Sequence, residues 1–288
     1  MIRSESKITV NVDVTNPGQF FACCGLLELA DRLWPGAEGW FDEAKFCIAC
    51  GGTLRQLLET VETTPLNSSV TDESLKRLGT LLSVKKSSLT REDLQEKEML
   101  RTKWQQERLH LERPFNLWLD WWRNETGERT PLKTWAAKQF IVDIVRPLQS
   151  ALESVLAQPV LDNILESSSE VDGLPLYFDS HTQCQSTALD TGFSLYDLRR
   201  IIPRSESTKP ALELLAFVGM QRFRLFPPQR DSTFRFNVWS TPLPVSIAVI
   251  AASGMHRQPA DCLYQFRLLD RTKYMKSFLP ATPIGDTA

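Results

Sequence analysis

The fold is decided by residues 8–33, ITVNVDVTNPGQFFACCGLLELADRL. Over Ile8–Val14, β-branched residues alternate with polar ones, which is the period-two pattern of a half-buried strand. Pro17 removes a backbone donor and Gly18 permits a tight turn, so we expect the strand to end before them. Across Gln19–Leu33, apolar residues recur at three- and four-residue spacings and predict a helix packed on a sheet. The chain therefore opens with a strand, a turn and a helix.

The remaining patterns predict helices and strands along the rest of the chain. A charge-rich stretch favours exposed helices, and aromatic alternation indicates a strand before a long helix bent at Pro147. The predicted strands are Trp40–Phe41, Lys45–Cys50, Phe115–Trp122, Leu174–Ser180, Phe234–Ser240 and Leu263–Leu269. The predicted helices are Thr53–Val61, two within Thr63–Arg113 with Thr90 as an N-cap, Leu132–Leu156 and Pro210–Met220.

This order of elements is typical of an α+β fold. We predict a ferredoxin-like (RRM-like) mixed sheet core that carries a large charged helical insertion. Residues 1–62 form the N-terminal half of the core, and residues 63–158 form the insertion with its Trp-rich segment. An Asp172–Gly173 turn marks the best boundary, after which residues 174–288 form the C-terminal half.

The composition is that of an ordinary soluble protein, with 42% hydrophobic residues, 24% charged residues and a net charge of -2. No run approaches the roughly 18 apolar residues that a membrane helix requires. Arg3, Glu5 and Lys7 stand where a signal peptide would be apolar, so we expect a cytoplasmic protein that does not engage a membrane. Its cysteines are too sparse for a disulfide scaffold and should remain thiols.

Charge is distributed unevenly along the chain. Residues 69–147 and 193–288 carry net charges of +3 and +6, whereas residues 1–68 and 148–192 carry -4 and -7. A polyanion should meet the two basic segments, although solvated helix faces would explain the same asymmetry.

The cysteines provide a weak signal for metal binding. Four thiolates could in principle bind zinc, but adjacent cysteines on a helix point about 100 degrees apart. Buried structural thiols are therefore the favoured interpretation. The cysteines concerned are Cys23, Cys24, Cys47 and Cys50.

Motifs for catalysis are also weak. His110, His181 and His256 are far apart in the sequence, and a pairing of His181 with Cys184 lacks a third orienting group. The segment after Gly51 lacks the Gly-Lys-Ser/Thr ending of a phosphate-binding loop. We predict no catalytic residue, no metal and no cofactor.

Polar and basic residues at turns remain as candidates for nucleic-acid binding. Some lie at a helix N-terminus, some at an exposed loop, and a cluster mixes arginines with Phe223 and Phe226. The alternatives are a helix cap for Asn16, solvated lysines and core phenylalanines. The predicted contacts are Asn16, Gln19, Lys85, Lys86, Arg199, Arg200, Gln221, Arg222, Arg224 and Arg230.

Four segments together resemble a known family. They are NPGQFFACCGLLELA at residues 16–30, LKTWA at 132–136, LDTGFS at 189–194 and PALELLAFVGMQRFR at 210–224. The chain resembles a subunit of type I-G (formerly I-U) CRISPR effector complexes, called Cascade, and is most similar to a large-subunit equivalent. The resemblance extends over most of the chain.

The resemblance implies a non-catalytic subunit that binds target DNA and guide RNA and checks the motif flanking the target. The implied partners are the guide RNA, the target DNA, the other effector subunits and a recruited helicase-nuclease. Three alternatives stay open: an RNA-binding backbone subunit, a guide-processing endoribonuclease that uses His181, and a structural adaptor.

Overall fold

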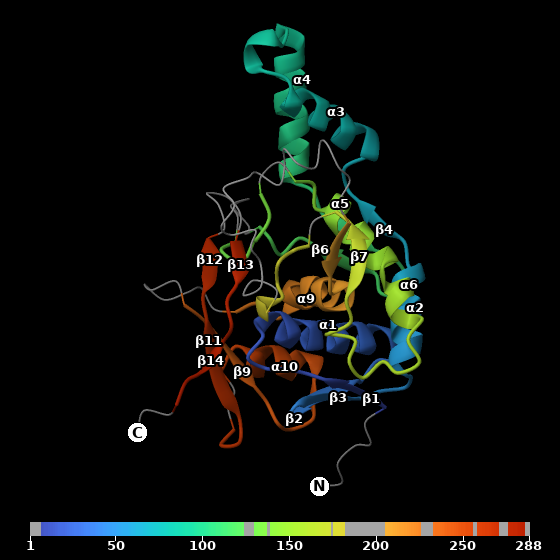
Figure 1. The fold of residues 1–288 in the computed structure, drawn as a ribbon, viewed down its shortest axis with the longest axis vertical. Helices are drawn as coiled ribbons and strands as arrows, with labels where there is room; N and C mark the ends of the chain where they lie inside the picture. Colours follow the sequence, from blue (N-terminus) through green and yellow to red (C-terminus); the bar gives the residue numbers. More distant parts are fainter. Residues whose placement is uncertain are drawn as a thin grey trace.

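A computed structural model describes residues 7–123, 130–136, 139–173, 175–181, 205–225, 233–255, 258–270 and 276–285, and these residues form a mixed α+β fold (Figure 1). The helices are α1 (Pro17–Leu33), α2 (Leu54–Thr63), α3 (Asp72–Ser83), α4 (Arg91–Gln105), α5 (Val142–Ser150), α6 (Leu152–Leu156), α9 (Pro210–Arg222) and α10 (Val245–Ala252). No helix within these ranges combines the length and apolar character needed to cross a membrane.

The strands form several small antiparallel sheets. The largest has the order β1-β3-β2-β10, and three-stranded sheets have the orders β14-β11-β9 and β4-β5-β6. Two further pairs are β7-β8 and β12-β13. The bounds are β1 Ile8–Asn11, β2 Glu38–Asp42, β3 Lys45–Ala49, β4 Leu66–Ser68, β5 Leu109–Leu111, β6 Leu117–Leu119, β7 Ser169–Asp172, β8 Ser205–Thr208, β9 Phe234–Val238, β10 Leu243–Pro244, β11 Cys262–Phe266, β12 Leu268–Asp270, β13 Lys276–Phe278 and β14 Thr282–Pro283.

The first sheet follows the opening motif predicted from the sequence. Strand β1 leads into α1, and the hairpin β2–β3 returns so that β3 lies between β1 and β2. This is the strand order of the first half of a ferredoxin-like sheet. Among the described residues, the fourth strand of this sheet is β10, which pairs with β2 and not with β1, so the complete strand order of the predicted ferredoxin-like core is not found.

Helices α1 and α9 lie side by side at the centre of the molecule (Figure 1). A Cβ atom added to Gly25 would lie 2.0 Å from the backbone oxygen of Leu215, and one added to Gly219 would lie 2.1 Å from that of Phe21. The two backbones therefore approach each other at reciprocal glycines. The helices run parallel, because positions further along α1 contact positions further along α9. Gly18 lies against Leu212, and Gly25 lies against Gly219.

Aromatic rings fill the core on both sides of this helix pair. On one side, Phe20 of α1 stacks on Phe236 at 4.2 Å, and the indole of Trp239 donates to the backbone oxygen of Gly39 at 2.7 Å. On the other side, Phe217 of α9 contacts Trp121 and Trp122. The helix pair thus joins the first sheet to the Trp-rich segment.

Helices α3 and α4 form an arm that projects at the top of Figure 1. Its own small core contains Leu78, Leu81 and Leu100. The predicted cap at Thr90 is confirmed, because its hydroxyl accepts from the amide of Asp93 and the Asp93 carboxylate accepts from the amide of Thr90.

Three predicted elements differ from the structure. The Phe115–Trp122 strand is confined to β6, because the chain turns at Trp121. The Leu132–Leu156 helix begins only at Val142 and breaks near Ala151 rather than at Pro147. Within the predicted Leu174–Ser180 strand, residues 175–179 are not strand: the amides of Phe178 and Asp179 donate to the side chain of Glu213, and the backbone oxygen of Tyr177 accepts from the amide of Phe278 at 3.2 Å.

The glycine contact makes a direct prediction about stability. Gly25→Ala places a methyl group against backbone that cannot move aside, so we expect the free energy of unfolding to fall by about 3 kcal/mol or more. Gly79→Ala is the matched control, because its Cβ would lie 3.6 Å from Phe140 and alanine favours the helix by about 1 kcal/mol. Urea unfolding measures both, and equal midpoints would contradict the proposed role of the glycine.

Candidate functional site

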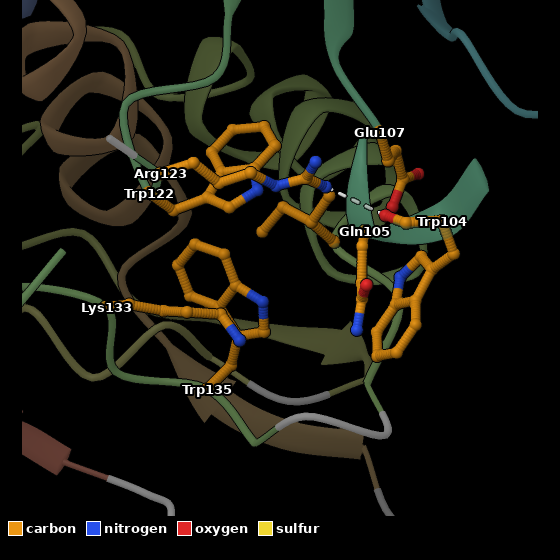
Figure 2. A pocket seen from close by; sticks show the side chains of 8 residues that line it. Trp104, Gln105, Glu107, Trp122, Arg123, Lys133 and Trp135 are labelled. Carbon is orange, nitrogen blue, oxygen red and sulfur yellow. Dashed lines mark hydrogen bonds between the residues drawn. The ribbon is translucent and has the colours of Figure 1, made fainter. Parts of the chain in front are cut away.

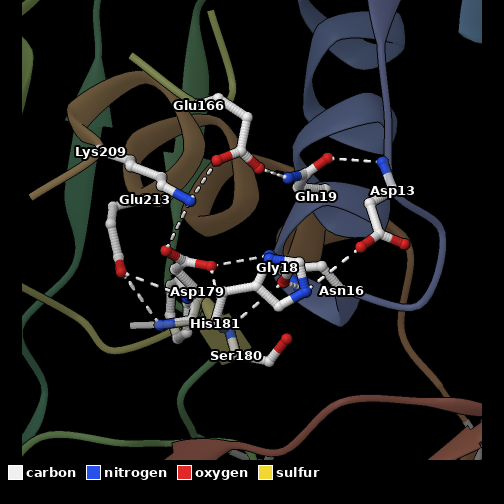
Figure 3. A network of polar contacts seen from close by, with 11 residues as sticks. Asp13, Asn16, Gly18, Gln19, Glu166, Asp179, Ser180, His181, Lys209 and Glu213 are labelled. Atoms are coloured by element: carbon white, nitrogen blue, oxygen red, sulfur yellow. Dashed lines mark hydrogen bonds and ion pairs between the residues drawn. The ribbon is translucent and has the colours of Figure 1, made fainter. Parts of the chain in front are cut away.

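The parallel helices create two ends with different chemistry. At the N-terminal end, Asn16 caps α1 through a hydrogen bond of 3.1 Å from the amide of Gly18 to its side-chain oxygen. The same oxygen accepts from the amide of Ser180 at 3.3 Å, and the side-chain amide donates to Asp179 at 2.7 Å (Figure 3). Asn16 therefore ties the helix start to a segment far along the chain.

Lys209 and Glu166 extend this network (Figure 3). The Lys209 ammonium lies 3.0 Å from a carboxylate oxygen of Asp179 and also contacts Glu166. Hydrogen bonds to these two carboxylates raise the pKa of Lys209 despite its partial burial. Gln19 joins the cluster, because its amide donates to Glu166 and its oxygen accepts from the amide of Asp13 at 2.7 Å.

Glu213 is the most perturbed acid at this end. Burial, with a smaller contribution from the nearby charge of Asp179, raises its pKa to about 8. Its carboxyl group accepts from the amides of Phe178 and Asp179. Glu213 thus anchors residues 178–179 to α9 and is largely protonated at neutral pH.

The predicted contacts Asn16 and Gln19 belong to this buried network. Their exposed fractions are 0% and 1%, so neither side chain presents surface to a polyanion. The alternative that we weighed for Asn16, a helix cap, is confirmed. Buried amides of this kind must find internal partners, and both have done so.

The C-terminal end of the same helices gathers arginines around one buried acid. Glu28 of α1 is 0% exposed and lies 2.7 Å from Arg32 and 2.9 Å from Arg222 of α9. Arg32 also donates to the backbone oxygen of Phe115 at 2.9 Å. The predicted contact Arg222 therefore has a structural role, since a buried carboxylate without a partner would be costly.

Gln221 connects this end to the strands β5 and β6. Its side-chain oxygen accepts from the amides of Asp120 and Trp121 at 2.9 and 3.0 Å. The Asp120 carboxylate in turn lies 2.8 Å from Arg108. Gln221, a predicted contact, thus acts as a backbone tether, and its amide nitrogen reaches Asp120 at 3.2 Å.

An exposed aromatic and cationic cluster continues from Arg108. The indole of Trp118 is 42% exposed and stacks on the ring of His110 at 4.3 Å. The guanidinium of Arg108 lies 4.8 Å from the centre of the Trp118 ring. Strands β5 and β6 pair His110 directly with Trp118, so the cluster follows from the sheet register. We call Arg108, His110, Trp118, Arg32, Arg222 and Arg224 the arginine–tryptophan surface.

Four of the six residues on this surface were not among the predicted contacts: Arg32, Arg108, His110 and Trp118. A usable signal was present, because Trp118 stands between Leu117 and Leu119 in an alternating strand. Since the two leucines are buried, the tryptophan must face the other way. The position of Arg32 beside Arg222 was not visible from the sequence.

The remaining predicted contacts fall into two groups. Arg224 is exposed, and its guanidinium donates only weakly, at 3.3 Å, to the backbone oxygen of Gln221. Lys85 and Lys86 are exposed between α3 and α4, where the short helix η1 (Lys86–Ser88) forms the tip of the arm. Arg199, Arg200 and Arg230 lie outside the described residues.

The cysteines of the N-terminal half, residues 1–62, pack as thiols in the structure. Cys23 and Cys24 are fully buried on α1, and this burial raises the pKa of each thiol well above its ordinary value. The thiol of Cys50 donates to the backbone oxygen of Gly52 at 3.4 Å. Within the described ranges, no three His, Cys, Asp or Glu side chains are grouped so that they could hold a metal ion.

Glu213 predicts how stability depends on pH. Because its pKa rises from an ordinary 4.5 to about 8 on folding, the folded chain binds the proton more tightly, and stability should fall as pH rises between these values. Glu213→Gln mimics the protonated acid and should flatten this part of the profile. Urea unfolding at a series of pH values measures the effect.

Glu59→Gln, at an exposed position of α2, is the control and should follow the original profile. Glu107, whose pKa is raised to about 7 by burial, adds a fall of the same sign in every variant. A Glu213→Gln profile parallel to that of the unmodified protein would show that Glu213 is not buried as a neutral acid.

Comparisons with family models, curated proteins and solved structures found no match for this chain.

Proposed function

We propose that the protein is a non-catalytic, nucleic-acid-binding subunit of a type I CRISPR RNA-guided complex. The observation that carries this proposal is the arginine–tryptophan surface, where exposed Trp118 stacks on His110 and contacts the guanidinium of Arg108. Grooves that bind nucleic acid combine cations for phosphates with aromatic rings for bases. The assignment to a type I CRISPR complex rests on the sequence resemblance.

Charge supports a polyanion at this surface. Four arginines face two carboxylates there, Glu28 and Asp120, and Glu28 is already neutralised inside the fold. Arg224 and Arg108 are exposed at the rim, where Arg108 is already paired with Asp120 at 2.8 Å. Phosphate contacts from such a surface position a strand without reading its sequence.

The arm supplies a second basic element. Lys85 and Lys86 project at its tip, and Arg91 begins α4 beyond it, with no acidic residue between residues 83 and 91. The arm is fixed internally by Arg77, which bridges Asp93 and Glu96 at 3.0 and 2.6 Å. A braced arm with a basic tip suits contact with a displaced strand or a neighbouring subunit.

The finer assignment follows the resemblance. The chain acts as the large-subunit equivalent in the cytoplasm, binds guide RNA and target DNA, checks the flanking motif, and works with other effector subunits and a recruited helicase-nuclease. The order of β1, β3 and β2 beside helix α1 supports a ferredoxin-like core for this subunit, because it is the order of the first half of that fold.

Binding of labelled single-stranded DNA and RNA to the purified protein tests the proposal. Trp118→Ala should weaken binding about fivefold or more with an unchanged salt slope, because stacking is not ionic. Arg224→Ala should lower the slope of log affinity against log salt by about one, and Lys85→Ala with Lys86→Ala by about two. Fluorescence anisotropy between about 50 and 200 mM salt measures both quantities.

Lys45→Ala, at an exposed residue of β3 in the acidic N-terminal segment, is the matched control and should leave binding unchanged. Co-expression with the other subunits and a guide RNA should yield one particle whose mass includes this chain. Salt-independent or absent binding to every nucleic acid, or exclusion from the particle, would overturn the proposal.

A second candidate function, guide-RNA processing, is favoured by one contact. The ring of His181 lies 3.2 Å from the carboxylate of Asp13, and both side chains are 41% exposed. A histidine held by a carboxylate is a common general base.

The two functions differ in what His181→Ala does. If the chain is non-catalytic, the variant should process guide RNA at the original rate in the assembled system, and Asp13→Asn should do the same. A gel assay of precursor cleavage gives the rate. A loss of cleavage of 100-fold or more in both variants, with the particle intact, would establish the nuclease instead.

A further inference from the structure

A pocket of about 160 Å³ opens where the base of the arm meets the Trp-rich segment (Figure 2). Its walls are indole rings: Trp104 ends α4 on one side, and Trp122 and Trp135 face it from the other. A cavity of about 150 Å³ is large enough to bind benzene, so this pocket has room for one small ring system.

The aromatic walls are held by packing. Trp122 stacks on Phe217 of α9 at 5.6 Å, and Trp122 and Trp135 pack against each other at 5.8 Å. Trp104 makes an edge contact with Phe140 at 5.5 Å. Rings fixed in this way lose little freedom when a ligand enters, which favours binding of a flat molecule.

Polar groups occupy defined positions around these rings. The Arg123 guanidinium donates to the backbone oxygen of Trp104 at 2.8 Å, as the dashed line in Figure 2 shows. The Lys133 ammonium lies 4.9 Å from the centre of the Trp135 ring. Gln105 presents its amide, and the buried carboxyl group of Glu107 accepts from the hydroxyl of Ser68 at 2.8 Å.

Charge decides which class of ligand fits. Three tryptophans beside an acid would suit an organic cation, but Arg123 and Lys133 already bring two positive charges to the lining. Burial raises the pKa of Glu107 to about 7, so much of this single opposing charge is absent near neutral pH. A positively charged ligand is therefore disfavoured. A ligand with a flat neutral ring and an attached anionic group is favoured.

We propose that this pocket receives one unstacked base of a single-stranded nucleic acid, with the adjoining phosphate beside Lys133 and Arg123. Unpaired bases bind proteins by stacking on aromatic side chains and by hydrogen bonds along their edges, and the tryptophans with Gln105 provide both. This inference rests on the proposed function and adds a position to it, since the arginine–tryptophan surface lies outside the pocket.

Photocrosslinking of a single-stranded oligonucleotide containing 5-iodouracil tests the proposal with the whole protein. Cleavage after lysine and arginine places Trp104 in residues 104–108 and Trp135 in residues 134–138, whereas Trp118 and Trp122 share residues 109–123. Fragmentation of that last peptide by mass spectrometry assigns the crosslinked tryptophan within it. We expect crosslinks at Trp104 or Trp135. Trp104→Ala should weaken oligonucleotide binding about 5-fold to 150-fold, the range for loss of one stacked base.

Two further variants keep the test independent of folding. Gln105→Tyr adds a ring at an exposed position that faces the pocket and should reduce the crosslink at Trp135 at least tenfold, with an unchanged urea midpoint. Gln106→Tyr, at the next exposed residue outside the lining, is the matched control and should leave the crosslink intact.

The outcomes separate the two proposals. Crosslinks confined to Trp118, with normal binding by Gln105→Tyr, would overturn the pocket assignment and leave the proposed function standing. Absence of oligonucleotide binding by the unmodified protein would remove both proposals.

Discussion

The close contact of α1 with α9 is the constraint on which the rest of the structure depends. Gly25 and Gly219 let each backbone lie against the other, so no side chain separates the helices at their crossing. The two helices run parallel, although almost two hundred residues separate them in the sequence. Both N-termini therefore lie at one end of the pair and both C-termini at the other, and the two helix dipoles add rather than cancel.

The distribution of charge follows from this arrangement. The carboxylates of Asp179 and Glu166 lie where the helices begin, and Arg32 and Arg222 gather where they end. The helix dipole favours both placements. The acidic end is closed by internal partners, with Lys209 held between two carboxylates, whereas the arginine end continues onto exposed residues of β5 and β6. The arginine end is therefore the end of this helix pair that presents exposed cations.

Local rules predicted what depends on a few neighbouring residues. The strand-turn-helix of residues 8–33, the Thr90 cap and the core helix after Pro210 all follow from patterns within one element. The same rules were wrong for Leu132–Leu156, where Trp135 packs against Phe217 instead of continuing a helix. For the site, composition identified Arg222 and Asn16 as polar residues at helix ends, but their partners Glu28 and Asp179 are 194 and 163 residues away. Such pairings arise from the tertiary fold, which no spacing in one sequence reveals.

The turn at residues 120–123 links the two proposed binding positions. Gln221 of α9 accepts from the amides of Asp120 and Trp121, and the next two residues, Trp122 and Arg123, line the pocket. On its other side, Asp120 holds Arg108, which lies over Trp118. One side chain of α9 thus fixes the backbone that orients both the exposed ring and the pocket wall. Because the α1 contact leaves α9 no room to shift, a strand lying on the arginine–tryptophan surface and a base entering the pocket would meet a preformed geometry, and the cost of ordering would fall on the nucleic acid.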